Sequence, residues 1–249
     1  MEPASSNEPI MKPSPGLAGW MPVWIRAISK PSEQTFIEIS DHPAARSSTA
    51  FIWVFLAGTV SAIISGLLSA ILMAAGVATT PVIPGLEQFT GPATADGGSI
   101  VTSLVTSLCA SPVAGIISVI VFAIGVGILQ WIARLLGGVG TFDQLAYALA
   151  AISVPITLVS ALFTGLAAVP YLGICTGLVS LGVAVYGFVL EVMAVKGVNR
   201  FSWGKAIGTV LIPVAVVLVL CLCVIVVAGV ALGPAISDLF NQINQGISP

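Results

Sequence analysis

The sequence predicts an all-α fold, a polytopic membrane bundle of five transmembrane helices with its N-terminus in the cytoplasm and its C-terminus outside. Charged residues make up 7% of the 249 residues and hydrophobic residues 57%, whereas ordinary soluble domains carry roughly 25% charged residues. Five apolar segments are each long enough to cross a hydrocarbon core of roughly 30 Å. All lysines and arginines fall on one side of this arrangement, which sets its direction across the bilayer.

The chain divides into three parts. Residues 1–17 are rich in proline and serine and predict a disordered tail, residues 18–48 form an amphipathic segment, and residues 49–240 hold the transmembrane domain. Tryptophan beside basic residues is typical of a segment at the membrane interface. Packing on the protein's own cytoplasmic face would explain the same pattern. The candidate interface residues are Trp20, Trp24, Arg26 and Lys30.

The five apolar segments each hold about 25 to 29 residues, enough to cross the bilayer with some tilt. Ser111 before Pro112 is typical of an N-cap followed by the first residue of a helix. The pattern from Thr141 to Gln144 fits a capping box. The predicted segments are 49–77, 112–136, 141–169, 171–195 and 206–232.

The distribution of basic residues gives the topology. The other side, made of residues 78–110, the turn near Pro170 and the tail from Gly233, carries no lysine or arginine. By the positive-inside rule the basic side faces the cytoplasm. Within 78–110, residues 100–108 predict an interfacial or re-entrant helix, or an extension of the second crossing. The basic residues are Lys12, Arg26, Lys30, Arg46, Arg134, Lys196, Arg200 and Lys205.

Small residues predict where the helices pack, because helices in lipid associate through close backbone approach. The first apolar segment carries a wide face of such residues over four turns, and the fourth carries a GxxxG pattern. Pro155 and Pro213 fall inside the third and fifth segments and predict kinks. The predicted packing residues are Ala57, Gly58, Ser61, Ala62, Ser65, Gly66, Ser69, Gly173 and Gly177.

Three stretches resemble the Yip1-domain family. They are "ISKPSEQTFIEISDHP" at 28–43, "GGVGTFDQLAYALAAISVP" at 137–155 and "VKGVNRFSWGKAIGTVLIP" at 195–213. The resemblance implies five membrane helices, a cytoplasmic N-terminus, and action through partners rather than through chemistry, as in vesicle traffic and membrane organisation. The D-L-Y-G-P pattern of eukaryotic members is absent. The chain is more similar to the prokaryotic branch, which implies a prokaryotic plasma (inner) membrane.

Four polar residues near the predicted inner ends of the helices are candidates for function: Arg134, Asp143, Glu191 and Lys196. An ionisable group within a membrane is a functional candidate by default. Asp143 lies in the first turn of a helix, where it would complement the helix dipole or serve a substrate or a proton. Glu191 lies one turn before Lys196, so the sequence predicts an ion pair with Lys196 or Lys205.

No catalytic residue, metal site or cofactor is predicted. His42 is the single histidine, and the sequence has no phosphate loop and no zinc-protease motif. Cys221 and Cys223 are predicted to be small packing residues, while Cys109 and Cys175 are either unrelated thiols or a disulfide. No basic patch suits a nucleic acid.

The sequence therefore favours a non-enzymatic scaffold or organiser, whose partners would be the lipid bilayer and either other membrane proteins or further copies of itself. The alternative is a transporter or channel subunit with a polar path near Asp143 and Glu191. A membrane enzyme is the least favoured class, because no polar cluster suited to catalysis is visible in the sequence.

Overall fold

The computed structural model describes residues 17–76, 97–167 and 172–247. The predicted tail up to residue 16, the connection 77–96 and the break at Pro170 lie outside the described residues. Within them the chain is all-helical, and five helices are long and apolar enough to cross a membrane, which confirms the predicted fold class. The helices are α1 (Leu17–Ser29), α2 (Glu33–Ser40), α3 (Ser47–Ala74), α5 (Gly97–Leu135), α6 (Phe142–Leu166), α7 (Leu172–Asn199) and α8 (Trp203–Ile247).

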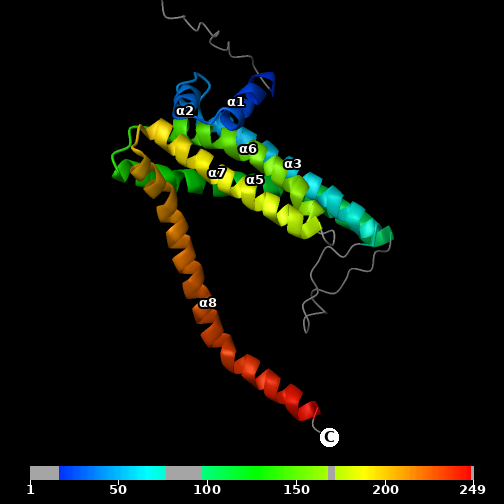
Figure 1. The fold of residues 1–249 in the computed structure, drawn as a ribbon. Coiled ribbons are helices and arrows are strands. Elements are labelled where there is room, and N and C mark those ends of the chain that lie inside the picture. The colour runs from blue at the N-terminus through cyan, green and yellow to red at the C-terminus, as the bar shows by residue number, and fades with distance from the viewer. Residues whose placement is uncertain (1–16, 77–96, 168–171, 248–249) are drawn as a thin grey trace, which may run out of the picture.

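The helices are arranged around α6 (Figure 1). α3 lies along both α5 and α6, and α7 packs on α6. The short helices α1 and α2 lie across one end of this bundle, where they contact α6 and α7. α8 meets α5 and α7 near its start and then runs away from the other helices.

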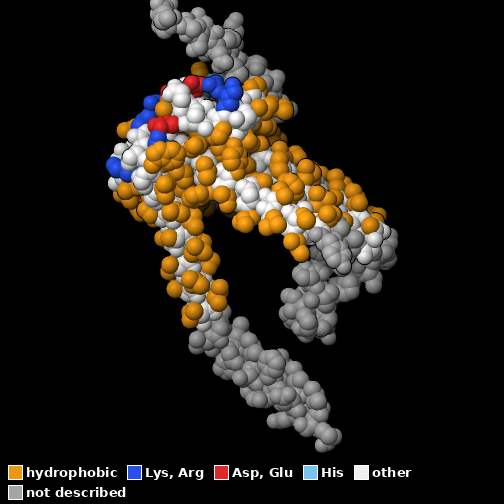
Figure 2. Space-filling model, viewed as in Figure 1, with side chains coloured by type: hydrophobic (Ala, Val, Ile, Leu, Met, Phe, Trp, Pro, Cys, Tyr) orange, Lys and Arg blue, Asp and Glu red, His pale blue; other side chains and the backbone are white. Residues whose placement is uncertain are grey.

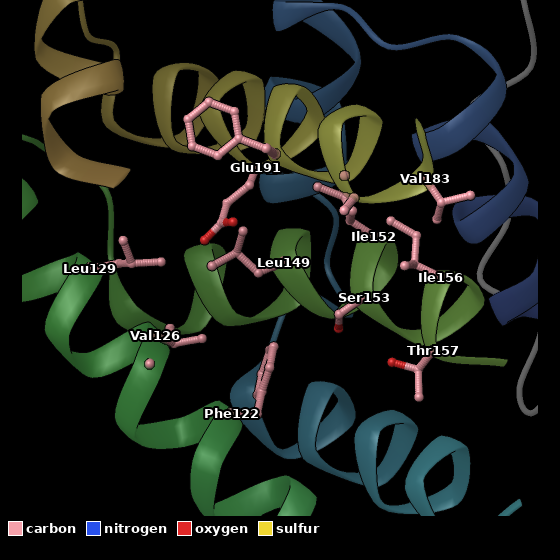
Figure 3. A pocket seen from close by; sticks show the side chains of 14 residues that line it. Phe122, Val126, Leu129, Leu149, Ile152, Ser153, Ile156, Thr157, Val183 and Glu191 are labelled. Atoms are coloured by element: carbon pink, nitrogen blue, oxygen red, sulfur yellow. The ribbon is translucent and has the colours of Figure 1, made fainter. Parts of the chain in front are cut away.

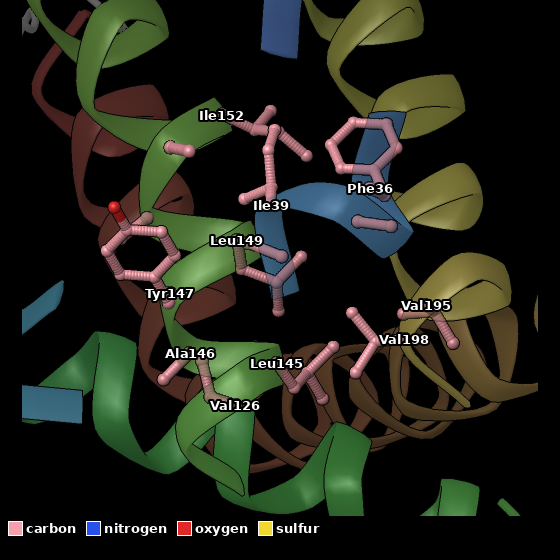
Figure 4. Packing of buried hydrophobic residues seen from close by; sticks show 14 of the residues in the cluster. Phe36, Ile39, Val126, Leu145, Ala146, Tyr147, Leu149, Ile152, Val195 and Val198 are labelled. Carbon is pink, nitrogen blue, oxygen red and sulfur yellow. The ribbon is translucent and has the colours of Figure 1, made fainter. Parts of the chain in front are cut away.

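The first half of α6 is buried on every side. The eight residues 145–152 are each at most 6% exposed, and four of them are alanines. A helix that is apolar all round belongs in the interior, and its small side chains let neighbouring helices approach closely. Figure 4 shows Phe36 and Ile39 of α2 meeting Leu149 and Ile152 of α6 in this core.

α3 and α5 pack with their backbones close together, along part of the predicted small-residue face. Gly58 and Gly66 of α3 are buried. A methyl group at Gly58 would lie 2.6 Å from Ser118 Oγ, and one at Gly66 would lie 2.5 Å from Ser107 Cβ. Ala57 is also buried. The other residues of the predicted face are half-buried: Ser61, Ala62, Ser65 and Ser69. The side of the face that carries the glycines therefore makes the closest contact.

The start of the second crossing differs from the prediction. α5 begins at Gly97, so Ser111 and Pro112 lie inside the helix rather than at its N-terminus. Proline cannot donate the helical hydrogen bond to the carbonyl four residues earlier. That carbonyl belongs to Leu108, and Ser111 Oγ donates to it instead at 2.9 Å. The serine thus replaces the missing bond, and residues 100–108 extend the crossing.

α5 ends at Leu135, one residue before the predicted end of the second segment, and two glycines follow Leu136. Gly137 has a left-handed φ of +86°, a conformation that glycine adopts without strain. Gly138 N donates to Ala133 O at 2.8 Å and Gly137 N to Arg134 O at 3.0 Å, the two bonds of a Schellman C-terminus. At the end of α7 the same left-handed position is held by Arg200, with φ 55°.

The other packing predictions are not met within the described chain. A methyl group at Gly173 would meet the Ala167 carbonyl at 2.9 Å, and one at Gly177 would meet no atom within 4 Å. The GxxxG pattern thus joins no pair of described helices. Cys221 and Cys223 are exposed on α8 rather than packed. Their exposure follows from the course of α8, whose most apolar part is only 6% buried.

Both predicted proline positions fall inside continuous helices. Pro155 lies in α6, and Pro213 lies in α8. The helices that hold the fourth and fifth crossings also run further than the predicted segments, because α7 continues to Asn199 and α8 extends from Trp203 to Ile247.

A substitution at Gly115 tests the close packing of α5 on α3. A methyl group there would lie 2.9 Å from the Phe55 carbonyl oxygen and closer still to Thr59 Oγ1. We expect Gly115→Ala to lower stability by about 1–3 kcal/mol through overpacking. Thermal unfolding in detergent micelles measures the effect.

The matched control is Gly127→Ala on the same helix, where an added methyl meets no atom within 4 Å. It should leave the unfolding midpoint unchanged or raise it, because alanine favours the helix by up to about 1 kcal/mol over glycine. Equal midpoints for the two variants would contradict the close approach of α3 and α5.

Candidate functional site

The described lysine and arginine side chains lie at one end of the bundle, which we call the basic end. Figure 2 shows charged side chains gathered there over α1, α2 and the adjoining part of α7, while apolar side chains cover the visible bundle below. The clustering matches the predicted grouping of basic residues. That this end faces the cytoplasm stays a prediction.

α2 is held on the basic end by its apolar face and by a glycine of α7. Ser32 caps the helix, since its Oγ accepts from Thr35 N at 3.1 Å. Phe36 is 0% exposed. A methyl group at Gly197 would lie 3.0 Å from both Glu33 O and Phe36 Cβ. Glycine at this position therefore lets α2 lie directly on the backbone of α7.

The tryptophans of α1 pack on the protein itself. The rings of Trp20 and Trp24 lie with their centroids 5.8 and 5.5 Å from that of Trp53 on α3. The ring of Trp53 in turn contacts that of Tyr147 of α6 in a tilted arrangement, with the centroids 4.8 Å apart. Of the two predicted alternatives for this segment, the structure places these two side chains on the protein's own end. Met21, which follows Trp20 in α1, is exposed.

Arg26 and Lys30, the other two candidate interface residues, lie at the end of α1. Arg26 forms an ion pair with Glu38 of α2, and both side chains are well exposed. Lys30 is exposed, and its carbonyl oxygen accepts a hydrogen bond from Thr35 Oγ1 at 2.9 Å. Both residues therefore help to join α1 to α2.

Lys196 connects three helices at the basic end. It is only 9% exposed and forms an ion pair with Glu33 of α2. Its Nζ also lies 4.9 Å from the ring centroid of Trp203, the first residue of α8. A buried ammonium group needs such partners, because removing it from water is costly. Lys196 thus joins α2, α7 and α8.

The predicted ion pair of Glu191 is wrong. Lys196 pairs with Glu33, and Lys205 Nζ donates to Leu136 O at 2.9 Å. Among the described residues the ion pairs are those of Arg26, Lys196 and Arg200, and none includes Glu191. The prediction compared only neighbours in sequence, whereas the actual partner Glu33 lies 163 residues from Lys196.

Asp143 has a structural role at the start of two helices. The capping box is confirmed, because Thr141 N donates to Gln144 Oε1 at 3.1 Å and Gln144 N to Thr141 Oγ1 at 3.3 Å. Asp143 Oδ1 accepts from Ser47 N at 3.2 Å, the first residue of α3. The N-cap residue of α3 is Arg46, which provides no side-chain bond of its own. Asp143 therefore caps α3 from a neighbouring helix.

Two buried amides at the basic end were not singled out from the sequence. Gln130 Nε2 donates to Gly140 O at 2.6 Å, and Asn199 Nδ2 donates to Val195 O at 3.2 Å. Methyl groups at Gly138 and Gly140 would lie 2.6 and 2.9 Å from Asn199 Oδ1. Both amides could have been found from the sequence, because each is a polar residue that lies within or beside an apolar run. Arg134 is exposed in the last turn of α5 and joins no ion pair among the described residues.

A cavity of about 400 Å³ lies between α5, α6 and α7, with Glu191 on its wall. Figure 3 shows the Glu191 side chain reaching from α7 toward Leu129 of α5 and Leu149 of α6. Most of the lining is apolar, and the polar side chains are Glu191, Ser153 and Thr157. Ser153 Oγ is buried without a hydrogen-bond partner. The cavity has the size and character of a small-molecule site, apolar with a few polar groups.

Asp143 and the two prolines lie outside this cavity. Its lining includes neither Asp143 nor Pro155 nor Pro213. The predicted polar path, which depended on Asp143 and Glu191 together, is therefore not continuous among the described residues. Of the four candidate polar residues, Glu191 is the one that lines this cavity among the described residues.

The described part of the chain contains neither a cluster of metal-binding side chains nor a disulfide. No three His, Cys, Asp or Glu side chains gather there as metal ligands would. Cys109 and Cys175 are both free and exposed, so the disulfide alternative is not formed.

Sequence comparison decides the family. The Yip1 domain matches residues 25–231, from within α1 into α8. The chain belongs to the Yip1-domain family. The match takes in all of α2 and the last five residues of α1, so α2 is part of the family's domain. No curated protein and no solved structure is similar enough to the chain to count as a match.

The ion pair between Glu33 and Lys196 gives a testable prediction about α2. Glu33→Gln leaves the 9% exposed Lys196 without its carboxylate. We expect α2 to lose about 1–3 kcal/mol of local stability, less than for a fully buried pair because the Glu33 side chain is 43% exposed. Hydrogen–deuterium exchange of the α2 amides measures the change.

Glu38→Gln is the control, since Glu38 lies on α2 as Glu33 does and the change removes its exposed ion pair with Arg26 of α1. It should cost under about 1 kcal/mol. If exchange of the α2 amides became faster by the same factor in both variants, the ion pair with Lys196 would stabilise α2 no more than the exposed pair with Arg26.

The cap on α3 gives a second prediction. Asp143→Ala removes the oxygen that accepts from Ser47 N and should lower the unfolding free energy by about 1 kcal/mol. Asp143→Asn keeps an acceptor oxygen and should be close to neutral. Thermal unfolding of both variants measures the effect. If the contact needed the negative charge rather than an acceptor oxygen, Asp143→Asn would lower the unfolding midpoint as much as Asp143→Ala.

Proposed function

We propose that this Yip1-family protein is a non-enzymatic membrane scaffold or organiser that works through contacts with other proteins or with lipids. The observation that carries the proposal is the placement of α8. Its most apolar part is only 6% buried, against 56% for α6. A helix that packs so little on its own chain leaves nearly its whole surface for lipid or for the helices of a partner.

The use of the polar groups supports the same function. Lys196, Glu33 and Asp143 are bound to each other or to backbone groups and serve to join helices. An organiser needs a rigid frame with free surfaces, and these contacts supply the frame. We place the protein in the plasma (inner) membrane of a prokaryote, on the resemblance of its motifs.

A transporter or channel subunit is the second candidate. The cavity wall at Glu191 favours it, because an ionisable side chain facing a space within a membrane is typical of a transport path. The capping role of Asp143 weighs against it, since that residue was the other half of the predicted path.

Photocrosslinking from α8 tests the scaffold function. A photoreactive amino acid replaces Leu218, which is 58% exposed, and the full chain is irradiated in its native membrane and purified. We expect an adduct of discrete mass with one partner protein, or with a second copy, identified by mass spectrometry. The matched control replaces Leu190, a leucine that is 0% exposed and should give no intermolecular adduct.

Native copurification in mild detergent gives the independent readout. A stoichiometric partner in the same preparation would support the organiser. A lone chain without protein adducts, together with solute flux in proteoliposomes that Glu191→Gln abolishes, would replace it by the transporter.

A further inference from the structure

We propose that the cavity between α5, α6 and α7 binds a phospholipid whose head carries a primary ammonium group. The ammonium lies on Glu191, and one acyl chain fills the apolar remainder. The inference rests on the proposed function, in that it names one of the lipid contacts through which the protein would act.

The cavity carries its carboxylate, Glu191, toward the basic end of the bundle, and its further lining is mostly apolar apart from the hydroxyl groups of Ser153 and Thr157. Glu191 on α7 and Leu149 on α6 lie toward the basic end, while Val183 and Thr157 lie further along the same helices. Glu191 and Val183 are eight residues apart on α7, as are Leu149 and Thr157 on α6, and eight residues span about 12 Å of helix at 1.5 Å per residue. Figure 3 shows the same order, with Val183 and Thr157 on the far side from Glu191. A bound amphiphile would point its head at the basic end and its chain toward the middle of the bundle.

Glu191 lies at a depth that a lipid head can reach. It precedes the end of α7 at Asn199 by eight residues, or about 12 Å of a helix about 42 Å long. The hydrocarbon core measures roughly 30 Å. A helix of this length centred on the core extends about 6 Å beyond it at each end, so Glu191 lies about 6 Å inside the border, where an ammonium arrives from the basic side without crossing the middle of the bilayer.

Two polar groups on the cavity wall have no partner among the described residues. Glu191 is in no ion pair and no hydrogen bond there, and Ser153 Oγ is buried without a hydrogen bond. A carboxyl group among apolar side chains is costly unless it is paired. An ammonium group supplies three donors and a positive charge, so it matches Glu191 in both respects.

Other occupants match less well. The carboxylate repels an anionic head, and a quaternary ammonium head has no N–H to donate. A transmembrane helix would have to bring lysine or arginine into the core, which is costly. α8 of a second copy does not offer one, because Lys205 in its first turn already bonds to Leu136 O.

Photoactivatable lipids test the proposal on the full chain in phosphatidylcholine nanodiscs. Phosphatidylethanolamine and phosphatidylglycerol with the same diazirine-labelled acyl chain are compared, and adducts are mapped by mass spectrometry. We expect phosphatidylethanolamine adducts on residues 122–129, 149–157 and 183–191. We expect about tenfold fewer with phosphatidylglycerol, the factor that a charge-assisted hydrogen bond provides.

Two variants locate the recognition. Glu191→Gln keeps the shape and removes the charge, so it should lower phosphatidylethanolamine labelling to the phosphatidylglycerol level at an unchanged unfolding midpoint. Ala184→Phe fills the cavity, whose lining includes Ala184, and should lower labelling by both lipids. The control Asp41→Asn removes an exposed carboxylate at the basic end and should change neither.

Equal labelling by the two lipids, or full labelling of Glu191→Gln, would overturn the proposal, as would adducts confined to other helices. Adducts between this cavity and a second copy would overturn it in favour of a protein occupant. Capture of a partner protein from α8 is a separate readout, so failure of the lipid site and failure of the organiser function can be told apart.

Discussion

Close approach of helix backbones is the constraint on which this structure depends. In a bilayer the hydrophobic effect gives little reason for one apolar helix to prefer another to lipid, so contact requires small residues at the interfaces. The chain meets this in three places: the buried alanine-rich half of α6, the glycines between α3 and α5, and Gly197 beneath α2. Where small residues meet no neighbour, as at Gly177, the described helices stay apart.

Polar groups have a second, more local task. Unsatisfied groups are expensive in an apolar setting, and three polar side chains at the basic end are bound at helix ends. Asp143 binds the start of α3, Lys205 the end of α5, and Lys196 joins α2 to α7. Glu191 is the exception, since it faces the cavity and has no partner in the described chain. That contrast, more than its charge alone, singles it out as a ligand contact.

Local patterns predicted much of this fold. Apolar length gave the five crossings, and the pattern around Thr141 gave the capping box, because both depend on residues close in sequence. The start of α5 could not be found in this way, since Ser111 beside Pro112 looks like a helix start and instead repairs a helix interior. The partner of Lys196 and the surroundings of Glu191 also escaped prediction, because both depend on how α2, α5, α6 and α7 come together in space.

Lys196 has a consequence for how distant parts of the molecule communicate. One ammonium group holds Glu33 of α2 on one side and the ring of Trp203 at the start of α8 on another. Two contacts that share an atom are energetically linked, and such linkage is reciprocal. A molecule that displaces α2 at the basic end therefore also changes the contact between Lys196 and Trp203 in the first turn of α8. In the same way, a neighbour that reorients α8 changes how strongly α2 binds to α7 through Glu33 and Lys196. The charge of Lys196 therefore couples the position of α2 at the basic end to the position of the first turn of α8.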